Sequence, residues 1–147
     1  MSDLLLIVTI ANRKVGIRAA EVNSVIALDN VTPVPRVPDY IPGLTALRSR
    51  ALTVIDCARS LELAEPVALE SIASRNAAVV EHDGHLYALL VDDVFDVMEA
   101  RSEPTPVPGR LASGWKRCAI GLVETDDAPV LLLDLGQVVG GPLEEAA

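Results

Sequence analysis

The sequence has few aromatic residues, few basic residues and no long apolar run. Aromatic side chains make up 3% of the 147 residues, so the core must be aliphatic, which suits small barrels or sandwiches. There are 12 Lys and Arg against 21 Asp and Glu, for a formal net charge of −9. Nucleic acids and anionic membrane surfaces attract concentrated Lys and Arg. The composition therefore argues against both as partners.

Membrane and disulfide signals are also missing. The apolar run 4–11 follows an acidic residue and has the length of a strand, which is too short to span a bilayer. The two cysteines, Cys57 and Cys118, are isolated in or beside apolar runs. A disulfide framework or a zinc site would need different spacing. We interpret them as core thiols in a reducing cytoplasm.

Short apolar segments separated by turn signals predict an all-β fold. Asp83 and Gly84 between two such segments predict a two-residue hairpin, and Asp56 is expected to cap a short helix over 57–63. Short helical turns are expected within 18–24, 67–72, 92–98 and 134–139. The expected strands are 4–11, 15–17, 25–28, the run ending at 56, 77–80, 86–91, the end of 92–98, 119–123 and 130–135.

The two halves of the chain share a pattern. Thr-Pro-Val-Pro occurs at 32–35 and again at 105–108, and a Gly-Leu pair precedes an Asp by the same interval in 43–56 and 121–134. This period is too long for a solenoid. The sequence therefore predicts two related units of about five strands, each the size of an SH3-like barrel. We expect sub-barrel one at about residues 1–70 and sub-barrel two at about 71–142.

No residue pattern points to catalysis or to a metal. His82 and His85 flank the predicted hairpin turn, but only Glu81 and Asp83 are near them, which is too few ligands for a metal site. We interpret them as exposed turn residues. The sequence has no Gly-rich phosphate loop, no nucleophile elbow and no His-Glu-x-x-His motif. We expect no enzyme activity and no cofactor.

Arg48 and Arg50 stand out in an acidic chain. They precede a strand and would point to the same side if the backbone is already extended. They could be edge charges that discourage aggregation. Arg48 could instead anchor a partner, or join the two halves through a carboxylate such as Asp92, which could itself cap a helix or belong to an interface. The matching region of the second half is Glu124–Asp127, and this asymmetry favours a function at Arg48.

An ordered set of residues in both halves resembles one known family. The residues are Val15-Gly16-Ile17, Val22, Pro38, Tyr40-Ile41, Gly43, Leu47-Arg48, Val54-Ile55-Asp56, Val91-Asp92, Val94, Val97, Gly121 and 132–135. Together they resemble the CheW family, the coupling proteins of bacterial chemotaxis, from about residue 4 to 139.

The resemblance implies a fold, partners and a site. The fold is two five-stranded SH3-like β-barrels packed together in one CheW-like domain over 1–147. Such cytoplasmic proteins have no catalytic activity and bridge the tips of methyl-accepting chemoreceptors to the regulatory domain of a CheA-type histidine kinase, without direct membrane insertion. Receptor tips dock in a groove between the barrels, and the kinase meets an apolar barrel end. The implied partner-binding residues are Val22, Ser24, Gly43, Leu44, Arg48, Val91 and Asp92.

Several positions depart from the family pattern. Ala46-Leu47-Arg48-Ser49 stands where Asn-Leu-Arg-Gly is usual, and Ser24, Thr53 and Cys57 replace an acidic residue, a proline and a leucine. The change at Ser49 matters most, because glycine permits backbone angles that serine resists. These departures motivate an alternative: a divergent regulatory module that competes for kinase or receptor sites, or serves a chemosensory pathway other than chemotaxis.

Overall fold

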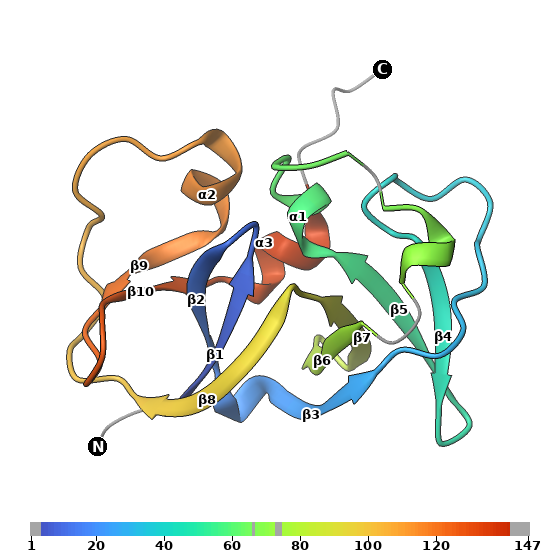
Figure 1. Ribbon diagram of the computed structural model, residues 1–147, viewed down its shortest axis with the longest axis horizontal. Helices are drawn as coiled ribbons and strands as arrows, with labels where there is room; N and C mark the ends of the chain where they lie inside the picture. Colours follow the sequence, from blue (N-terminus) through green and yellow to red (C-terminus); the bar gives the residue numbers. More distant parts are fainter. Residues whose placement is uncertain (1–3, 66, 73–74, 142–147) are drawn as a thin grey trace.

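The computed structural model describes residues 4–65, 67–72 and 75–141, and this part of the chain forms two five-stranded β-sheets with short helices between them (Figure 1). The prediction of an all-β fold with two five-stranded units is confirmed. One sheet has the strand order β8-β1-β2-β10-β9, with β1 (Leu4–Ile10), β2 (Arg13–Arg18), β8 (Asp93–Glu99), β9 (Ala119–Val123) and β10 (Val130–Leu133). The other has the order β3-β6-β7-β5-β4, with β3 (Val22–Ala27), β4 (Gly43–Leu47), β5 (Arg50–Asp56), β6 (Asn76–His82) and β7 (His85–Leu90).

Five short helical segments accompany the strands, four of them between strands and one after the last strand. They are α1 (Cys57–Ser60), α2 (Ser113–Cys118), α3 (Leu135–Gly140) and the 3-10 turns η1 (Ala19–Glu21) and η2 (Leu69–Ser71), counted within the described residues. The predicted turns within 18–24 and 67–72 are present, and Asp56 caps α1 as predicted, since its side chain accepts a hydrogen bond from the Arg59 N–H. The turn expected at the start of 92–98 is absent, because β8 begins directly at Asp93. None of the described helices has both the length and the apolar character needed to cross a membrane.

Each sheet combines the first hairpin of one half of the chain with the last three strands of the other half. The β1–β2 hairpin lies with β8–β10, and the β6–β7 hairpin lies with β3–β5. Parallel pairs join the halves, β2 with β10 and β7 with β5. The two sheets have the same strand order, as the sequence repeat predicts. The expected division near residue 70 does not separate them, because the two opening hairpins are exchanged.

The burial of β1 and β6 explains this exchange. Leu5 and Ile7 on one face of β1 enter the core of their own sheet, while Leu6 and Val8 on the other face enter a larger core shared by both sheets. β6 repeats the pattern, with alternate residues in the core of its own sheet and in the shared core. A strand that is apolar on both faces is stable only between two apolar layers. The exchanged hairpins therefore form the wall between the barrels.

Equivalent backbone contacts in the two halves confirm the structural repeat. Thr32 pairs with Leu44, and Thr105 pairs with Leu122. Each of these contacts brings the segment after β3 or β8 onto the strand at the far edge of the same sheet. Asp56 N–H donates to the Tyr40 carbonyl at 2.8 Å, and Asp134 N–H donates to the Cys118 carbonyl at 2.8 Å. The predicted matches of Gly43 with Gly121 and of Asp56 with Asp134 hold in three dimensions.

The three α-helices meet at one junction between the barrels. The Arg117 guanidinium on α2 donates to the carbonyls of Ser60, at 2.6 Å, and Gln137. The Ser60 hydroxyl is buried and donates to the Val138 carbonyl at 2.7 Å. Gly114 on α2 lies against α1, and a Cβ atom there would be 1.8 Å from the Leu61 carbonyl oxygen. A positive charge against carbonyl oxygens at helix ends is stabilising.

We expect Gly114→Ala to destabilise the protein by about 2 kcal/mol or more, because the added methyl group would collide with backbone that cannot move aside without separating α1 from α2. Gly140→Ala on α3 is the matched control, since a Cβ atom there meets nothing within 4 Å. That variant should be unchanged or more stable by up to about 1 kcal/mol. Urea unfolding of both variants measures the difference, and equal midpoints would contradict the close contact at the helix junction.

Candidate partner-docking surface

The seven predicted site residues lie on three parts of the structure. Val22 and Ser24 are on β3, Gly43 and Leu44 open β4, and Arg48 is in the turn between β4 and β5. Val91 and Asp92 form the connection from β7 to β8, which crosses from one sheet to the other. The seven residues therefore lie on the edge strand β3, at the base and the tip of the β4–β5 hairpin, and in a crossover between the barrels.

Val22 begins an edge strand at the border of the shared core. It is half-buried, pairs with Val80 and packs against that core. Its repeat partner Val94 does the same on β8, the equivalent edge strand of the other sheet. Further along these strands Val25 and Val97 are 43% and 46% exposed. Both edges therefore present valine side chains to solvent where the core ends.

Ser24 follows an irregularity in this edge. The pairing of β3 with β6 shifts register between Val22 and Ser24, and Ser24 is half-buried. Such bulges bend a strand and change the direction of its side chains. The bulge lies within the edge that was predicted to contact a partner.

Gly43 and Leu44 have different parts in the structure. Gly43 is buried, and a Cβ atom there would lie 2.1 Å from the Thr32 carbonyl oxygen. Its role is to let the segment after β3 pack on β4. Leu44 exchanges backbone hydrogen bonds with Thr32 and remains 37% exposed. Of the two, only the Leu44 side chain is available to a partner.

Val91 is 1% exposed and belongs to the shared core. A side chain this deeply buried cannot contact a partner. Val91 can only help to hold the neighbouring Asp92 in place. The resemblance to the CheW family implied Val91, together with Asp92, as part of the docking groove. Its burial follows from the crossover, which carries the chain through the space between the sheets.

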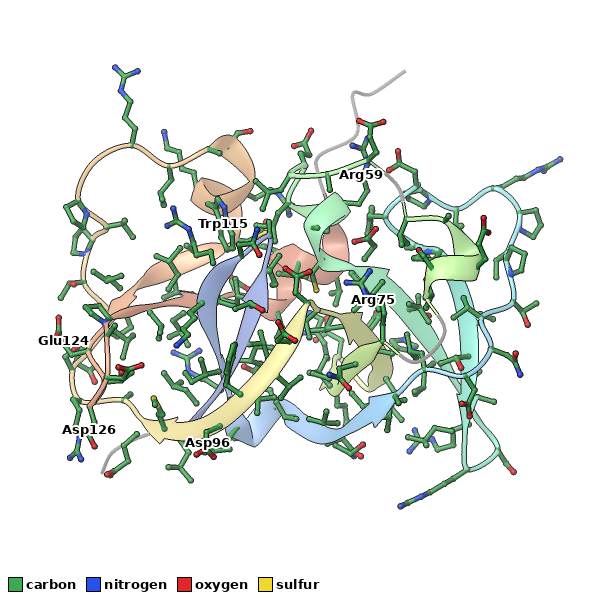
Figure 2. All side chains as sticks on the ribbon, in the orientation of Figure 1. Arg59, Arg75, Asp96, Trp115, Glu124 and Asp126 are labelled. Carbon is green, nitrogen blue, oxygen red and sulfur yellow. The ribbon has the colours of Figure 1, made fainter. Side chains whose placement is uncertain are left out.

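Asp92 joins the two barrels, as the sequence analysis considered, but its partners are Asn12 and Arg75. One of its oxygens accepts a hydrogen bond from the Asn12 N–H in the β1–β2 turn, and the other pairs with Arg75 at 3.5 Å. Arg75 also donates to the Val91 carbonyl and lies near the centre of the view in Figure 2. The predicted helix cap at Asp92 is wrong, because a strand follows it. Its basic partner is Arg75 rather than Arg48.

Arg48 and Ser49 form a tight hairpin turn in the left-handed backbone conformation. Their φ angles are 51° and 68°, as a two-residue turn between right-twisted strands requires. The idea that Arg48 and Arg50 share one face is therefore wrong, since Arg48 is in the turn and Arg50 begins β5. β4 was also missed, because the turn at 48–49 lacks the usual glycine. The sequence analysis singled out Ser49 because glycine is usual at this position. Serine here does adopt a backbone conformation that glycine favours.

The charge on this turn is unbalanced. Arg48 and Arg50 are exposed, and neither has an ion-pair partner among the described residues. The equivalent turn of the other sheet is different, since Asp126 makes a two-bond contact with Arg101 and Asp127 pairs with Lys14. The Arg101 guanidinium lowers the pKa of the Asp126 carboxyl. Figure 2 shows Asp126 at the opposite end of the molecule from the β4–β5 hairpin of Figure 1.

The candidate chemical groups have ordinary structural surroundings. His82 and His85 face each other across the β6–β7 hairpin, and His82 lies 3.4 Å from Asp83. The described residues contain no group of three His, Cys, Asp or Glu placed to hold a metal ion. Cys57 and Cys118 are buried free thiols. Burial raises the pKa of both thiols, that of Cys118 to about 11, which keeps them protonated at neutral pH.

Comparison with known proteins gives consistent matches. The family model described as "CheW-like domain" matches residues 4–141. The chain is 30% identical over 122 residues to the chemotaxis protein CheW of Rhizobium meliloti (strain 1021), covering 79% of this chain and 74% of the relative. The crystal structure of scaffolding protein TtCheW from Thermoanaerobacter tengcongensis superimposes with a TM-score of 0.76 at 22% identity, covering 91% of this chain and 90% of that one.

We expect Ser49→Gly to stabilise the protein by about 0.5–1 kcal/mol, because glycine removes the cost of a left-handed conformation. The reciprocal control is Gly84→Ser in the β6–β7 turn, where φ is 81° and a Cβ atom would meet nothing within 4 Å. It should destabilise by a similar amount. Thermal unfolding measures both changes, and a Ser49→Gly variant no more stable than the wild type would show that the turn carries no strain.

Proposed function

The chain belongs to the CheW-like family, and on this basis we propose that it is a non-enzymatic cytoplasmic adaptor that couples methyl-accepting chemoreceptors to a CheA-type histidine kinase. The family match over residues 4–141 supports the adaptor role. The finer assignment of partners is supported by a relative described as a chemotaxis protein and a solved structure described as a scaffolding protein.

The observation that best supports a binding site is the exposed Arg48 in the β4–β5 turn. Arg48 is exposed on a hairpin tip without an ion pair among the described residues, whereas the acids of the equivalent β9–β10 turn are paired within the molecule. The repeat keeps the strand framework, and the charge at the tip of this hairpin is one of the features that differ between the two halves. An arginine that does not serve its own fold is free to bind a carboxylate or a carbonyl of a partner.

The rest of the surface supports docking of an amphipathic partner. Val22 and Leu44 are partly exposed apolar side chains, and Ser24 is a half-buried polar group beside the bulge in the β3 edge. A helical receptor tip has the alternating apolar and polar faces that such an edge can accept. In this proposal Gly43 and Val91 shape the surface from below, and Asp92 holds the crossover in place.

A second candidate function is competition for kinase or receptor sites without support of signalling. Ser49 in the left-handed turn favours it, since the strained tip departs from the family pattern beside the residue that we expect to bind. Adding the purified protein to a receptor–kinase reconstitution separates the two functions. An adaptor raises kinase autophosphorylation above the receptor–kinase baseline, and a competitor lowers it when a standard coupling protein is present.

We expect Arg48→Ala to weaken receptor or kinase binding by about tenfold or more, because an arginine at an interface centre typically contributes a large share of the affinity. Folding should be unchanged, since the side chain makes no ion pair in the described structure. Co-sedimentation with receptor-containing membranes measures receptor binding, and titration with the kinase regulatory domain measures kinase binding.

The matched control is Arg36→Ala. Arg36 is also exposed and also left-handed, with a φ of 64°, so the control reproduces both the loss of charge and the backbone conformation at a different loop. Wild-type binding by Arg48→Ala in both assays would remove Arg48 from the site. An equal loss in Arg36→Ala would show that only net charge matters.

A further inference from the structure

The outer half of the β4–β5 hairpin extends beyond its sheet as a two-stranded ribbon. β4 pairs with β5 as far as Leu47 and Arg50 beside the turn, whereas the pairing of β5 with β7 begins only at Thr53. Figure 1 shows the end of this hairpin projecting from the molecule at the lower right. Two strands without a third are only marginally stable in water. The ribbon can therefore open locally while the rest of the sheet stays paired.

The tip of this ribbon carries a serine between two arginines. Residues 48–51 are all exposed, and neither Arg48 nor Arg50 has an ion pair within the described residues. Ser49 has a φ of 68°, a conformation that glycine would adopt at lower cost. Backbone strain that persists at an exposed position points to a use for the side chain placed there. That side chain supplies one reactive group, a hydroxyl with a cation on either side.

We propose that Ser49 is a phosphorylation site for a Ser/Thr protein kinase that selects basic substrates. In the reaction Ser49 Oγ forms a bond to the γ-phosphorus of ATP, the bond from that phosphorus to the β,γ-bridging oxygen breaks, and ADP leaves. The hydroxyl proton passes to the carboxylate base of the Ser/Thr kinase. The two arginines supply the charge that an acidic substrate groove attracts, and opening of the ribbon supplies an extended segment around the hydroxyl.

A phosphate on Ser49 changes the charge of the turn. The two arginines contribute opposite charge to a phosphoserine, which carries about −1.5 to −2 at pH 7. The modified turn is therefore close to neutral, and Arg48 gains a partner within its own chain. This step rests on the proposed function, because it makes the binding of a receptor or histidine kinase by Arg48 depend on whether Ser49 is modified.

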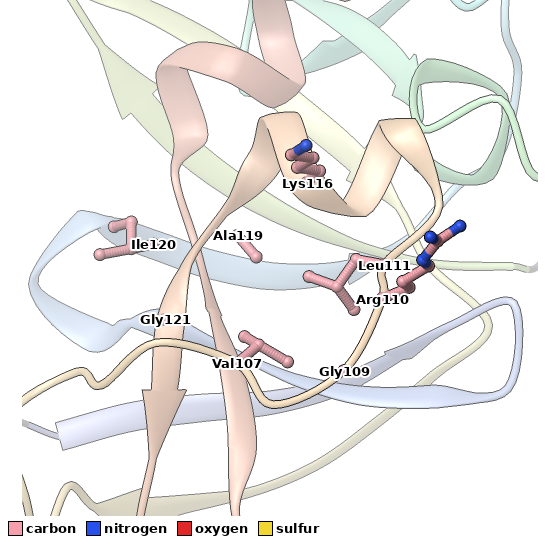
Figure 3. A pocket seen from close by; sticks show the side chains of 8 residues that line it. All are labelled: Val107, Gly109, Arg110, Leu111, Lys116, Ala119, Ile120 and Gly121. Atoms are coloured by element: carbon pink, nitrogen blue, oxygen red, sulfur yellow. The ribbon is translucent and has the colours of Figure 1, made fainter.

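Ser113 on α2 is a matched serine in similar basic surroundings. It is exposed, and Figure 3 shows Arg110 on the loop before it and Lys116 on the helix after it. Its neighbour Gly114, however, lies against the Leu61 carbonyl, so an extended conformation here requires α1 and α2 to separate. We expect Ser113 to be a poor phosphate acceptor for this reason.

The test of the site incubates the full chain with labelled ATP and a purified Ser/Thr kinase of basic specificity. Ser49→Gly should lower incorporation about tenfold or more, because it removes the hydroxyl and keeps the turn. Ser113→Ala should incorporate label within about twofold of the wild type. Equal labelling of Ser49→Gly and the wild type would overturn the proposal, as would absence of phosphate on Ser49 in the chain isolated from growing and starved native cells.

A disulfide across the ribbon tests whether it must open. Ala46 and Ala51 face each other and are exposed, and the native Cys57 and Cys118 are buried. Ala46→Cys with Ala51→Cys should accept label about tenfold more slowly when oxidised than when reduced, because the closed bond holds the two strands together. Equal rates in the two forms would contradict local opening as the route to the hydroxyl.

A full chain with phosphoserine incorporated at position 49 during synthesis tests the consequence. It should bind receptor-containing membranes and the histidine kinase regulatory domain about tenfold more weakly than the wild type. Wild-type binding by this chain, together with weak binding by Arg48→Ala, would overturn the regulatory step. Normal binding by Arg48→Ala as well would count against the adaptor surface and leave the modification site standing, so the two failures are distinguishable.

Discussion

The exchange of opening hairpins is the constraint on which the rest of this structure depends. β1–β2 and β6–β7 each complete the sheet of the other half and form the wall between the barrels. β1, β6 and β7 have apolar side chains on both faces, and β2 adds Val15 and Ile17 to the shared core, so neither barrel has a finished core without the other. Crossovers at 18–22 and 91–93 then join the sheets covalently, and Asp92 and Arg117 tie them by hydrogen bonds. The two barrels are one cooperative unit.

This shared framework leaves the repeat free to differ at its surface. The residues that build the framework agree between the halves: both capping aspartates, both glycines that face a threonine carbonyl, and both valines at the border of the core. Positions outside this framework differ. Arg48 is exposed where the other turn holds Asp126 and Asp127, and at a half-buried position Ala119 stands where the other barrel has Ile41. The repeated residues thus stabilise both barrels in the same way, and we expect partner proteins to bind where the two halves differ.

The sequence predicted the elements better than their assembly. The strands, the cap at Asp56, the Asp83–Gly84 turn and the repeat follow from local patterns, because turn chemistry and apolar runs are properties of neighbouring residues. The hairpin exchange could not be predicted in this way, since the parallel pairing of Val15 with Leu131 joins distant parts of the chain. β4 was missed because Arg48-Ser49 forms a glycine-type turn without glycine. At the site, Arg48 and Leu44 lie on the surface, but the burial of Val91 and the pairing of Asp92 with Arg75 depend on the crossover.

The exchanged hairpins also set an order of events during synthesis. β2 is made early, yet its parallel neighbour β10 comes more than a hundred residues later. β1 pairs with β8, which is also made late. The first hairpin therefore leaves the ribosome with both edges unpaired and with the apolar side chains on both faces of β1 uncovered. β3–β7, by contrast, form a continuous stretch that can pair as soon as β7 emerges. Non-local strand pairing is slow, and exposed edges invite association. The earliest segment of this chain is therefore the last to find its place, and it is the segment most in need of protection while the rest is being made.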